Sequence, residues 1–216
     1  GTAISLLARY PSEESLEAIR RAARDHDPLV RRSSFLGLEV FEPHLRVPIA
    51  VDRLQDPVRA VRIEAARSLA SLPPGVLSDA QNRAVQTGLG EFIVAQLANA
   101  ERPERHMNLG NLYAERGQWD DAETAYRTAI RIDQGAVQSY VNLADLYRIQ
   151  NREQDCERFL RQAIDIAPEL AASHHALGLS LVRQKRTVEA IKSLHLAADL
   201  DPDEMRFAYV YAVALM

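Results

Sequence analysis

The fold is decided by residues 103–136, which read PERHMNLGNLYAERGQWDDAETAYRTAIRIDQGA. The two stretches that follow have the same length and the same pattern. Residues 137–170 read VQSYVNLADLYRIQNREQDCERFLRQAIDIAPEL, and residues 171–204 read AASHHALGLSLVRQKRTVEAIKSLHLAADLDPDE. Internal repetition with a period of this length is typical of helical hairpins that stack into one continuous core.

Six positions recur together at the spacing of 34 residues. The first half of each stretch supplies Leu109, Leu143 and Leu177, then Gly110, Ala144 and Gly178, then Tyr113, Tyr147 and Leu181. The second half supplies Ala122, Cys156 and Ala190, then Ala129, Ala163 and Ala197, and the turns keep Pro168 and Pro202. The small residues predict places where the two helices of a hairpin approach closely, and Tyr113 and Tyr147 are expected to fill the space between hairpins.

This pattern resembles the tetratricopeptide repeat family. His106, Tyr140 and His174 stand where that family often has Trp, and Gln134 replaces the first of its turn prolines. The resemblance implies three repeats, at 103–136, 137–170 and 171–204. It also implies that residues 205–216 begin the first helix of a further repeat or form a cap.

The first part of the chain has a looser period. Asp25, Pro28, Val30 and Arg31 are followed 31 residues later by Asp56, Arg59, Val61 and Arg62. This arrangement resembles the short HEAT-type repeat, so we expect HEAT-like hairpins over residues 1–77. Asp27 and Asp56 are predicted N-caps, and Pro28 and Pro57 suit the first helical position. The expected helices lie near 2–9, 13–25, 28–40, 43–54 and 57–71.

A helix is expected to connect the two repeat arrays. Residues 72–75 read LPPG and break the chain, after which Ser78 and Gln81 form a capping-box pattern. The segment 78–102 is therefore predicted to be a connecting helix, about 79–100, whose middle Gly88 and Gly90 weaken. Together these patterns predict an all-α fold, an α-solenoid in which HEAT-like hairpins precede tetratricopeptide repeats.

Several functional classes are disfavoured. The net charge of -4 and the pI near 5.9 argue against a nucleic-acid partner. Cys156 occupies a position otherwise filled by Ala, which favours a packed thiol over a nucleophile. Adjacent His174 and His175 point about 100° apart on a helix, and even with His195 nearby they predict no metal site. Because phosphate-binding and hydrolase motifs are also lacking, we expect no enzymatic activity and no cofactor.

The sequence bears on membrane insertion but does not specify the cellular compartment of the protein. The longest apolar run, residues 207–216, is about half of what a membrane span needs. The sequence therefore predicts a soluble protein, cytoplasmic or periplasmic, without membrane insertion, and we interpret it as a piece of a longer protein. Self-association through the last helix remains open.

Repeat geometry predicts where a partner binds. The first helices of stacked hairpins line a concave groove, and residues not needed for packing project into it. The predicted groove residues are Met107, Asn108, Asn111, Asn142, Asp145, Arg148, His175, Leu179 and Arg183. Such a mixture of amides, charges and apolar side chains suits an extended peptide or a partner protein. Asn108 and Asn142 lie 34 residues apart and either form a ladder that binds a peptide backbone or bond within their own repeats.

The family resemblance also tests one known binding mode. Tetratricopeptide adaptors of heat-shock chaperones hold a terminal carboxylate with Asn and Lys/Arg residues. Asn111 and Asn142 match those asparagines, whereas Met107, Ala172 and Ala176 replace the basic residues. We therefore expect no carboxylate clamp of that kind. The arginine-rich helices around Arg31, Arg32, Arg59 and Arg62 form a second candidate surface.

Three functions thus remain. The leading hypothesis is a non-catalytic scaffold that binds an extended peptide or partner protein in the groove. The alternative is a C-terminal appendage of a larger enzyme or of a periplasmic multihaem electron-transfer protein, since HEAT-like repeats before tetratricopeptide repeats resemble part of some bacterial multihaem cytochrome proteins. A structural spacer without any ligand is the third. Cys-x-x-Cys-His motifs upstream would favour the electron carrier.

Overall fold

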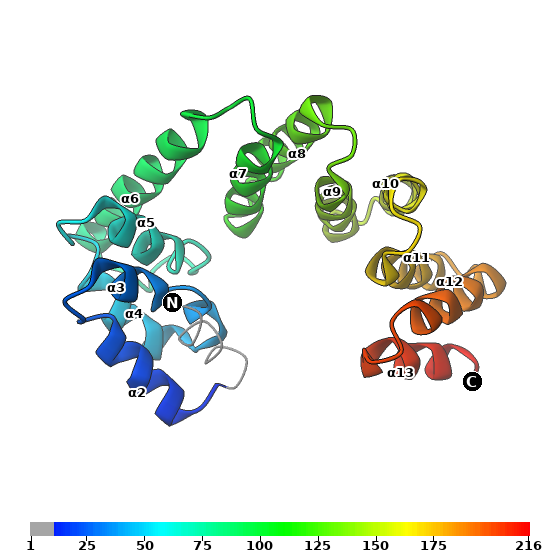
Figure 1. Ribbon diagram of the computed structural model, residues 1–216, viewed down its shortest axis with the longest axis horizontal. Coiled ribbons are helices and arrows are strands. Elements are labelled where there is room, and N and C mark those ends of the chain that lie inside the picture. The colour runs from blue at the N-terminus through cyan, green and yellow to red at the C-terminus, as the bar shows by residue number, and fades with distance from the viewer. Residues whose placement is uncertain (1–10) are drawn as a thin grey trace. The chain divides into compact units, whose positions relative to one another are not determined.

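The computed structural model describes residues 11–216, and the secondary structure of this part is helical, without strands. The chain divides into two compact units, and the division in the sequence falls between Ala98 and Asn99. Each unit consists of successive helices packed against one another (Figure 1). No helix within residues 11–216 has both the length and the apolar character needed to cross a membrane.

The first unit has the helices expected of short hairpins, but they are shorter than predicted. They are α2 (Glu13–Ala22), α3 (Pro28–Ser33), the 3-10 helix η1 (Leu38–Val40), α4 (Pro43–Val51), α5 (Arg59–Arg67) and α6 (Asp79–Leu97). The predicted helix at 2–9 falls outside the described residues.

The prediction of one helix over 28–40 was wrong, because α3 ends at Ser33. The hydroxyl groups of Ser33 and Ser34 donate to the backbone carbonyls of Val30 and Arg31, at 2.9 and 2.7 Å. These local bonds compete with continuation of the helix. Gly37 then adopts a φ of 84°, which glycine accommodates without a Cβ clash.

Asp25 and Asp56, 31 residues apart, form equivalent turns. Each side chain accepts a hydrogen bond from the backbone N–H two residues later, at 2.8 and 2.9 Å. Asp27 is the N-cap of α3, as predicted, with its carboxylate accepting from Leu29 N–H at 2.8 Å. The corresponding prediction for Asp56 was wrong: its turn delays the start of α5 to Arg59, so Pro57 precedes the helix.

The two arginines of the repeat hold these turns in place. Arg31 donates to the carbonyl oxygens of Asp25 and His26, and its other nitrogens bind both carboxylate oxygens of Asp56, at 2.8 and 3.1 Å. Arg62 donates likewise to the carbonyl of Asp56 and to the carboxylate of Glu91 on α6. Each arginine therefore ties its own turn to the next helix pair.

Helix α6 packs against α5 within the first unit. Its predicted capping box is confirmed, because Ser78 and Gln81 bond reciprocally to each other's backbone N–H. Gly88 is more than a weak point in the helix. A Cβ there would lie 2.6 Å from the Cβ of Ala66 and 3.1 Å from the carbonyl oxygen of Arg62, so glycine permits the close approach of the two helices.

The two glycines of α6 give a matched test. Gly88→Ala is expected to lower the free energy of unfolding by about 1 to 3 kcal/mol, because the new methyl group enters an occupied space. Gly90→Ala meets no atom within 4 Å and should raise it by about 0.5 to 1 kcal/mol through the better helix propensity of Ala. Thermal unfolding followed by circular dichroism measures both changes. Equal effects at the two positions would contradict the packing of α5 on α6.

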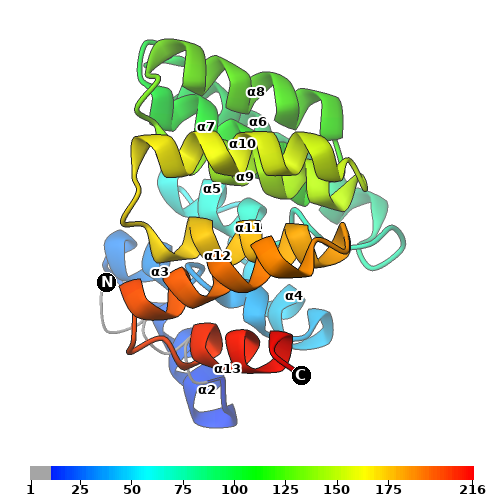
Figure 2. The same ribbon diagram turned by 90° about the vertical axis from the view of Figure 1, so that its right-hand side faces the viewer.

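The second unit is a solenoid of three helical hairpins followed by one further helix. The helices are α7 (Pro103–Glu115), α8 (Trp119–Ile132), α9 (Val137–Ile149), α10 (Glu153–Ile166), α11 (Ala171–Arg183), α12 (Thr187–Leu200) and α13 (Met205–Ala214). The starting residues of equivalent helices reproduce the 34-residue period. Figure 2 shows α8, α10 and α12 in one layer, with α7, α9 and α11 behind it.

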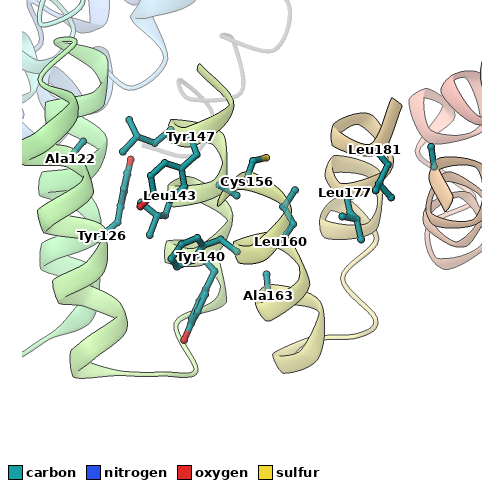
Figure 3. Packing of buried hydrophobic residues seen from close by; sticks show 14 residues of the cluster. Ala122, Tyr126, Tyr140, Leu143, Tyr147, Cys156, Leu160, Ala163, Leu177 and Leu181 are labelled. Atoms are coloured by element: carbon teal, nitrogen blue, oxygen red, sulfur yellow. The ribbon is translucent and has the colours of Figure 1, made fainter. Parts of the chain in front are cut away.

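The repeated small and aromatic residues form the core of this unit (Figure 3). Tyr147 is fully buried and Cys156 is 2% exposed. As predicted, Gly110 and Gly178 lie where helices touch. A Cβ at Gly110 would lie 2.4 Å from the Tyr126 ring, and one at Gly178 would lie 2.6 Å from Cγ of Leu194.

One position of the repeat, which is often Trp in tetratricopeptide repeats, has the same structural role in all three copies of this chain. His106 and His174 each place Nε2 close to a backbone carbonyl six residues earlier, that of Ala100 at 2.8 Å and that of Pro168 at 2.7 Å. Tyr140 donates its hydroxyl to the corresponding carbonyl, that of Gln134, at 3.2 Å. Because a carbonyl only accepts, Nε2 must carry the proton in both histidines. These bonds fix each first helix to the loop that precedes it.

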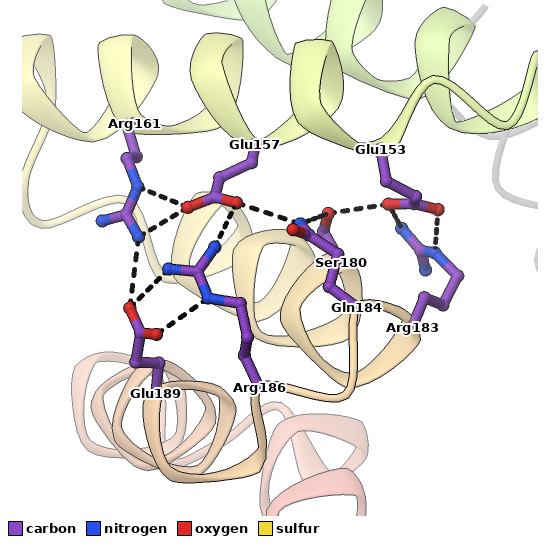
Figure 4. A network of polar contacts seen from close by, with 8 residues as sticks. All are labelled: Glu153, Glu157, Arg161, Ser180, Arg183, Gln184, Arg186 and Glu189. Carbon is purple, nitrogen blue, oxygen red and sulfur yellow. Dashed lines mark hydrogen bonds and ion pairs between the residues drawn. The ribbon is translucent and has the colours of Figure 1, made fainter.

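The second-helix layer carries ion pairs with the same 34-residue period. In the network of Figure 4, Glu157 binds Arg161 at 2.7 Å and Arg186 at 2.6 Å, and Arg186 also binds Glu189. One repeat earlier, Glu123 binds Arg127 and Arg152, and Arg152 binds Asp155. Burial works to raise the pKa of Glu157, but hydrogen bonds from Arg161, Gln184 and Arg186 outweigh it and lower that pKa. The networks therefore connect each second helix to the hairpin that follows it.

Candidate functional site

Two adjoining pockets lie along the first helices of the second unit. The α7–α9 pocket has a volume of about 280 Å³, and the α9–α11 pocket has a volume of about 330 Å³. Asn142 and Asp145 of α9 line both of them. We refer to the two pockets together as the groove.

Seven of the nine predicted groove residues line these pockets. They are Asn111, Asn142, Asp145, Arg148, His175, Leu179 and Arg183. Met107 lies outside both pockets and packs, partly buried, against the hydrophobic core. Asn108 is half-buried and also lies outside them.

The α7–α9 pocket contains a chain of polar contacts. Asn142 donates its amide to Oδ1 of Asn111 at 2.8 Å, and the hydroxyl of Tyr126 donates to the same oxygen at 2.9 Å. Gln138 in turn donates to Oδ1 of Asn142 at 2.7 Å. Asn142 thus bonds to Asn111 of the preceding repeat. One α-helical turn separates Asn108 from Asn111, and Asn111 faces Tyr126.

The α9–α11 pocket is formed where α9, α10, α11 and the start of α13 meet. Arg148 binds Asp145 at 2.6 Å on the same helix, and Arg183 binds the carboxylate of Glu153 on α10. Leu179 and Val141 provide apolar surface between these charges. The pocket thus offers apolar contact surrounded by charged and amide groups, a composition that suits ligand binding.

His175 closes one side of the α9–α11 pocket. It is 7% exposed, and its ring lies 4.6 Å from the Phe207 ring of α13, centroid to centroid. Burial, followed by the charge of Arg206, lowers the pKa of His175. Its buried Nδ1 has no hydrogen-bond partner among the described residues. The site therefore contains a neutral imidazole with an unsatisfied nitrogen in its wall.

The other chemically notable side chains have separate surroundings. His174 bonds to Pro168, whereas His195 on α12 pairs with Asp199 at 3.2 Å. Burial raises the pKa of the Cys156 thiol, which disfavours the reactive thiolate. Within residues 11–216, no three His, Cys, Asp or Glu side chains are placed to hold a metal ion.

The second candidate surface, in the first unit, is occupied by internal contacts. Arg31 and Arg62 bind Asp56 and Glu91, as described above. Arg32 binds Glu64 at 3.0 Å, and Arg59 donates to the backbone carbonyl of Glu91 at 2.8 Å. These guanidinium groups hold helices together. They are therefore less available to a partner than the side chains that line the groove.

Two polar residues of the groove lie outside the first helices of the three repeats, and neither was predicted. Tyr126 reaches the α7–α9 pocket from a second helix, which no first-helix pattern reveals. Arg206 reaches the α9–α11 pocket from α13. Its position could have been found, because it lies 34 residues after Ala172, at the start of the helix predicted to open a further repeat.

Family models agree with both halves of this description. The model described as "Tetratricopeptide repeat" matches residues 103–169, and the model described as "HEAT repeats" matches residues 1–70. The chain thus carries both kinds of repeat. No curated protein matches the sequence significantly.

Solved structures with the same fold include several tetratricopeptide proteins. The Arabidopsis OM64 TPR domain is 24% identical with a TM-score of 0.50, over 54% of this chain and 96% of that one. The MamA protein is 16% identical with a TM-score of 0.51, over 88% and 92%. The first TPR of Spaghetti (RPAP3), bound to the HSP90 peptide SRMEEVD, is 16% identical with a TM-score of 0.50, over 54% and 92%. At these identities the likeness establishes the fold.

Proposed function

We propose that this chain of HEAT and tetratricopeptide repeats is a non-catalytic scaffold that binds an extended segment of a partner protein in the groove. The observation that carries the proposal is the pair of adjoining pockets, which share Asn142 and Asp145. An extended segment advances about 3.3 Å per residue with side chains on alternating sides. It could therefore place alternate side chains in the two pockets while its backbone passes Asn142.

The chemistry of the groove supports a peptide over a small metabolite. Asn142 keeps one amide N–H beyond its bond to Asn111, because a side-chain amide carries two donors. Val141 and Leu179 supply shallow apolar contact. The Spaghetti (RPAP3) repeat, which has this fold, is bound to a peptide. Its likeness to this chain supports the proposed mode of binding and does not identify a partner.

A random-peptide selection with the whole chain tests this function. We expect extended peptides to be enriched on the unchanged protein. Ala176→Phe introduces a ring into the α9–α11 pocket, which Ala176 lines, and should reduce binding at least about tenfold, since a lost apolar contact and a steric clash together exceed 1.4 kcal/mol. The matched control is Gln162→Phe on the exposed surface of α10. Failure to enrich any peptide, or equal loss in both variants, would contradict the proposal.

A further inference from the structure

The three arginines that line the α9–α11 pocket are not equally available. Arg148 binds Asp145 at 2.6 Å, and Arg183 binds the carboxylate of Glu153. Arg206 is exposed, and no carboxylate in the described part of the chain lies within ion-pair distance of it. Arg206 is therefore the arginine of this pocket whose charge a partner could neutralise without breaking an existing ion pair.

Glu204 is the acidic residue closest to Arg206 in the sequence, and its carboxylate is engaged elsewhere. As the N-cap of α13, it accepts a hydrogen bond from the backbone N–H of Arg206, at 3.2 Å. The pKa of His175, in the wall of the same pocket, shows which of the two charges acts more strongly there. After burial, the positive charge of Arg206 lowers this pKa more than the negative charge of Glu204 raises it. The charge of Arg206 thus reaches the wall of the pocket.

The size of this available charge limits the chemistry of the group that binds. An ionised carboxylate carries one negative charge, which matches one guanidinium group. A phosphate group carries about −1.5 to −2 near neutral pH and needs a second cation. Arg148 and Arg183 could supply that cation only by leaving their own carboxylates. A carboxylate therefore fits this pocket better than a phosphate group.

The carboxylate is expected on a side chain within the partner segment and not at its end. The pocket continues into the α7–α9 pocket, because Asn142 lines both of them. Met107, Ala172 and Ala176 stand where chaperone adaptors of this repeat family have the basic residues that hold a terminal carboxylate. Arg206 lies one repeat beyond Ala172, on α13, and so does not belong to that set of positions.

We infer that the groove selects its partner segment by an acidic side chain, Asp or Glu, that enters the α9–α11 pocket and binds Arg206. The inference rests on the proposed function. A basic residue at the same position of the segment would repel Arg206, so the charge also excludes segments that carry Lys or Arg there.

The random-peptide selection with the whole chain tests this inference. Enriched peptides should share one position that holds Asp or Glu and lacks Lys and Arg. In a synthetic copy with an amidated C-terminus, the change of that residue to Asn or Gln should weaken binding about two- to fivefold, as expected for an ion pair open to solvent. This loss should become smaller as the salt concentration is raised.

Charge reversal at Arg206 gives the sharpest outcome. Arg206→Glu should bind the peptide with Lys at the acidic position more tightly than the original peptide, which reverses the order found with the unchanged chain. Arg131→Glu is the matched control, because it makes the same charge change at an exposed residue of α8 that lies outside both pockets. It should leave the order unchanged. Circular dichroism verifies that each variant is folded. If Arg206→Glu is not, Arg206→Gln replaces it and should remove the preference.

Three outcomes would refute the role of Arg206 while leaving peptide binding intact. They are enriched peptides without a shared acidic position, an acidic preference that survives the loss of Arg206, and binding that requires a free terminal carboxylate. Absence of any enriched peptide would instead refute the proposed function.

Discussion

Gly110→Leu is expected to destabilise the second unit by about 3 kcal/mol, at the upper end of what overpacking costs. The reason is the Tyr126 ring, which approaches the position of an added Cβ to 2.4 Å, with two further ring atoms at 2.5 and 2.9 Å. Tyr126 is 3% exposed and donates its hydroxyl to Asn111, so the ring has little freedom to move away. Thermal unfolding followed by circular dichroism gives the loss.

A double-mutant cycle separates this clash from a general effect of leucine. Gly110→Ala should already destabilise the unit, and adding Tyr126→Leu should cost less in the Ala variant than in the parent. Because Tyr126 lines the α7–α9 pocket, its displacement should also weaken peptide binding. An unchanged unfolding temperature for Gly110→Leu would show that α7 and α8 do not meet at this glycine.

Asp56→Ala is the second substitution with a large expected effect, a loss of about 3 kcal/mol in the stability of the first unit. The side chain of Asp56 is 1% exposed and accepts hydrogen bonds from Arg31 and from Val58 N–H. Its removal leaves the guanidinium of Arg31 without its carboxylate and unties α3 from the turn before α5. Asp56→Asn is the control, because its amide oxygen can still accept from Val58, and it should lose less. Hydrogen exchange of α3 and α5 locates the effect.

Asp56 also makes the first unit sensitive to acid. Burial alone would raise the pKa of Asp56, but the hydrogen bonds from Arg31 and Val58 outweigh it and lower that pKa below its ordinary value. A carboxyl group with a lowered folded-state pKa contributes its full stability above the unfolded pKa, about 4, and loses it as the pH falls through the folded value. The parent should therefore lose stability below about pH 4 more steeply than Asp56→Asn. Parallel pH profiles would contradict this role.

The sequence predicted the hairpins of the second unit more closely than the helices of the first. In residues 103–204 each repeat gives independent evidence for the same boundaries, so the period identifies Gly110 and Gly178 as contact positions before any coordinates are seen. In the first unit, two loosely matching copies cannot show that Ser33 and Ser34 end a helix. From the sequence pattern alone, two serines are equally compatible with a helix that continues past them.

The sequence alone determined the all-helical class, the repeat period and the face on which seven of the groove residues lie. It could do so because helix geometry converts a constant spacing into a constant face. Only the tertiary structure decided that Asn142 bonds to Asn111 and that Tyr126 enters the groove from a second helix. It also decided that Arg206 has no carboxylate within ion-pair distance among residues 11–216. These features depend on distances between residues of different helices. A hydrogen bond or an ion pair is lost when the separation of its two groups increases by a few ångströms. A period in the sequence specifies which residues face a groove, whereas the packing of the helices selects which of them meet.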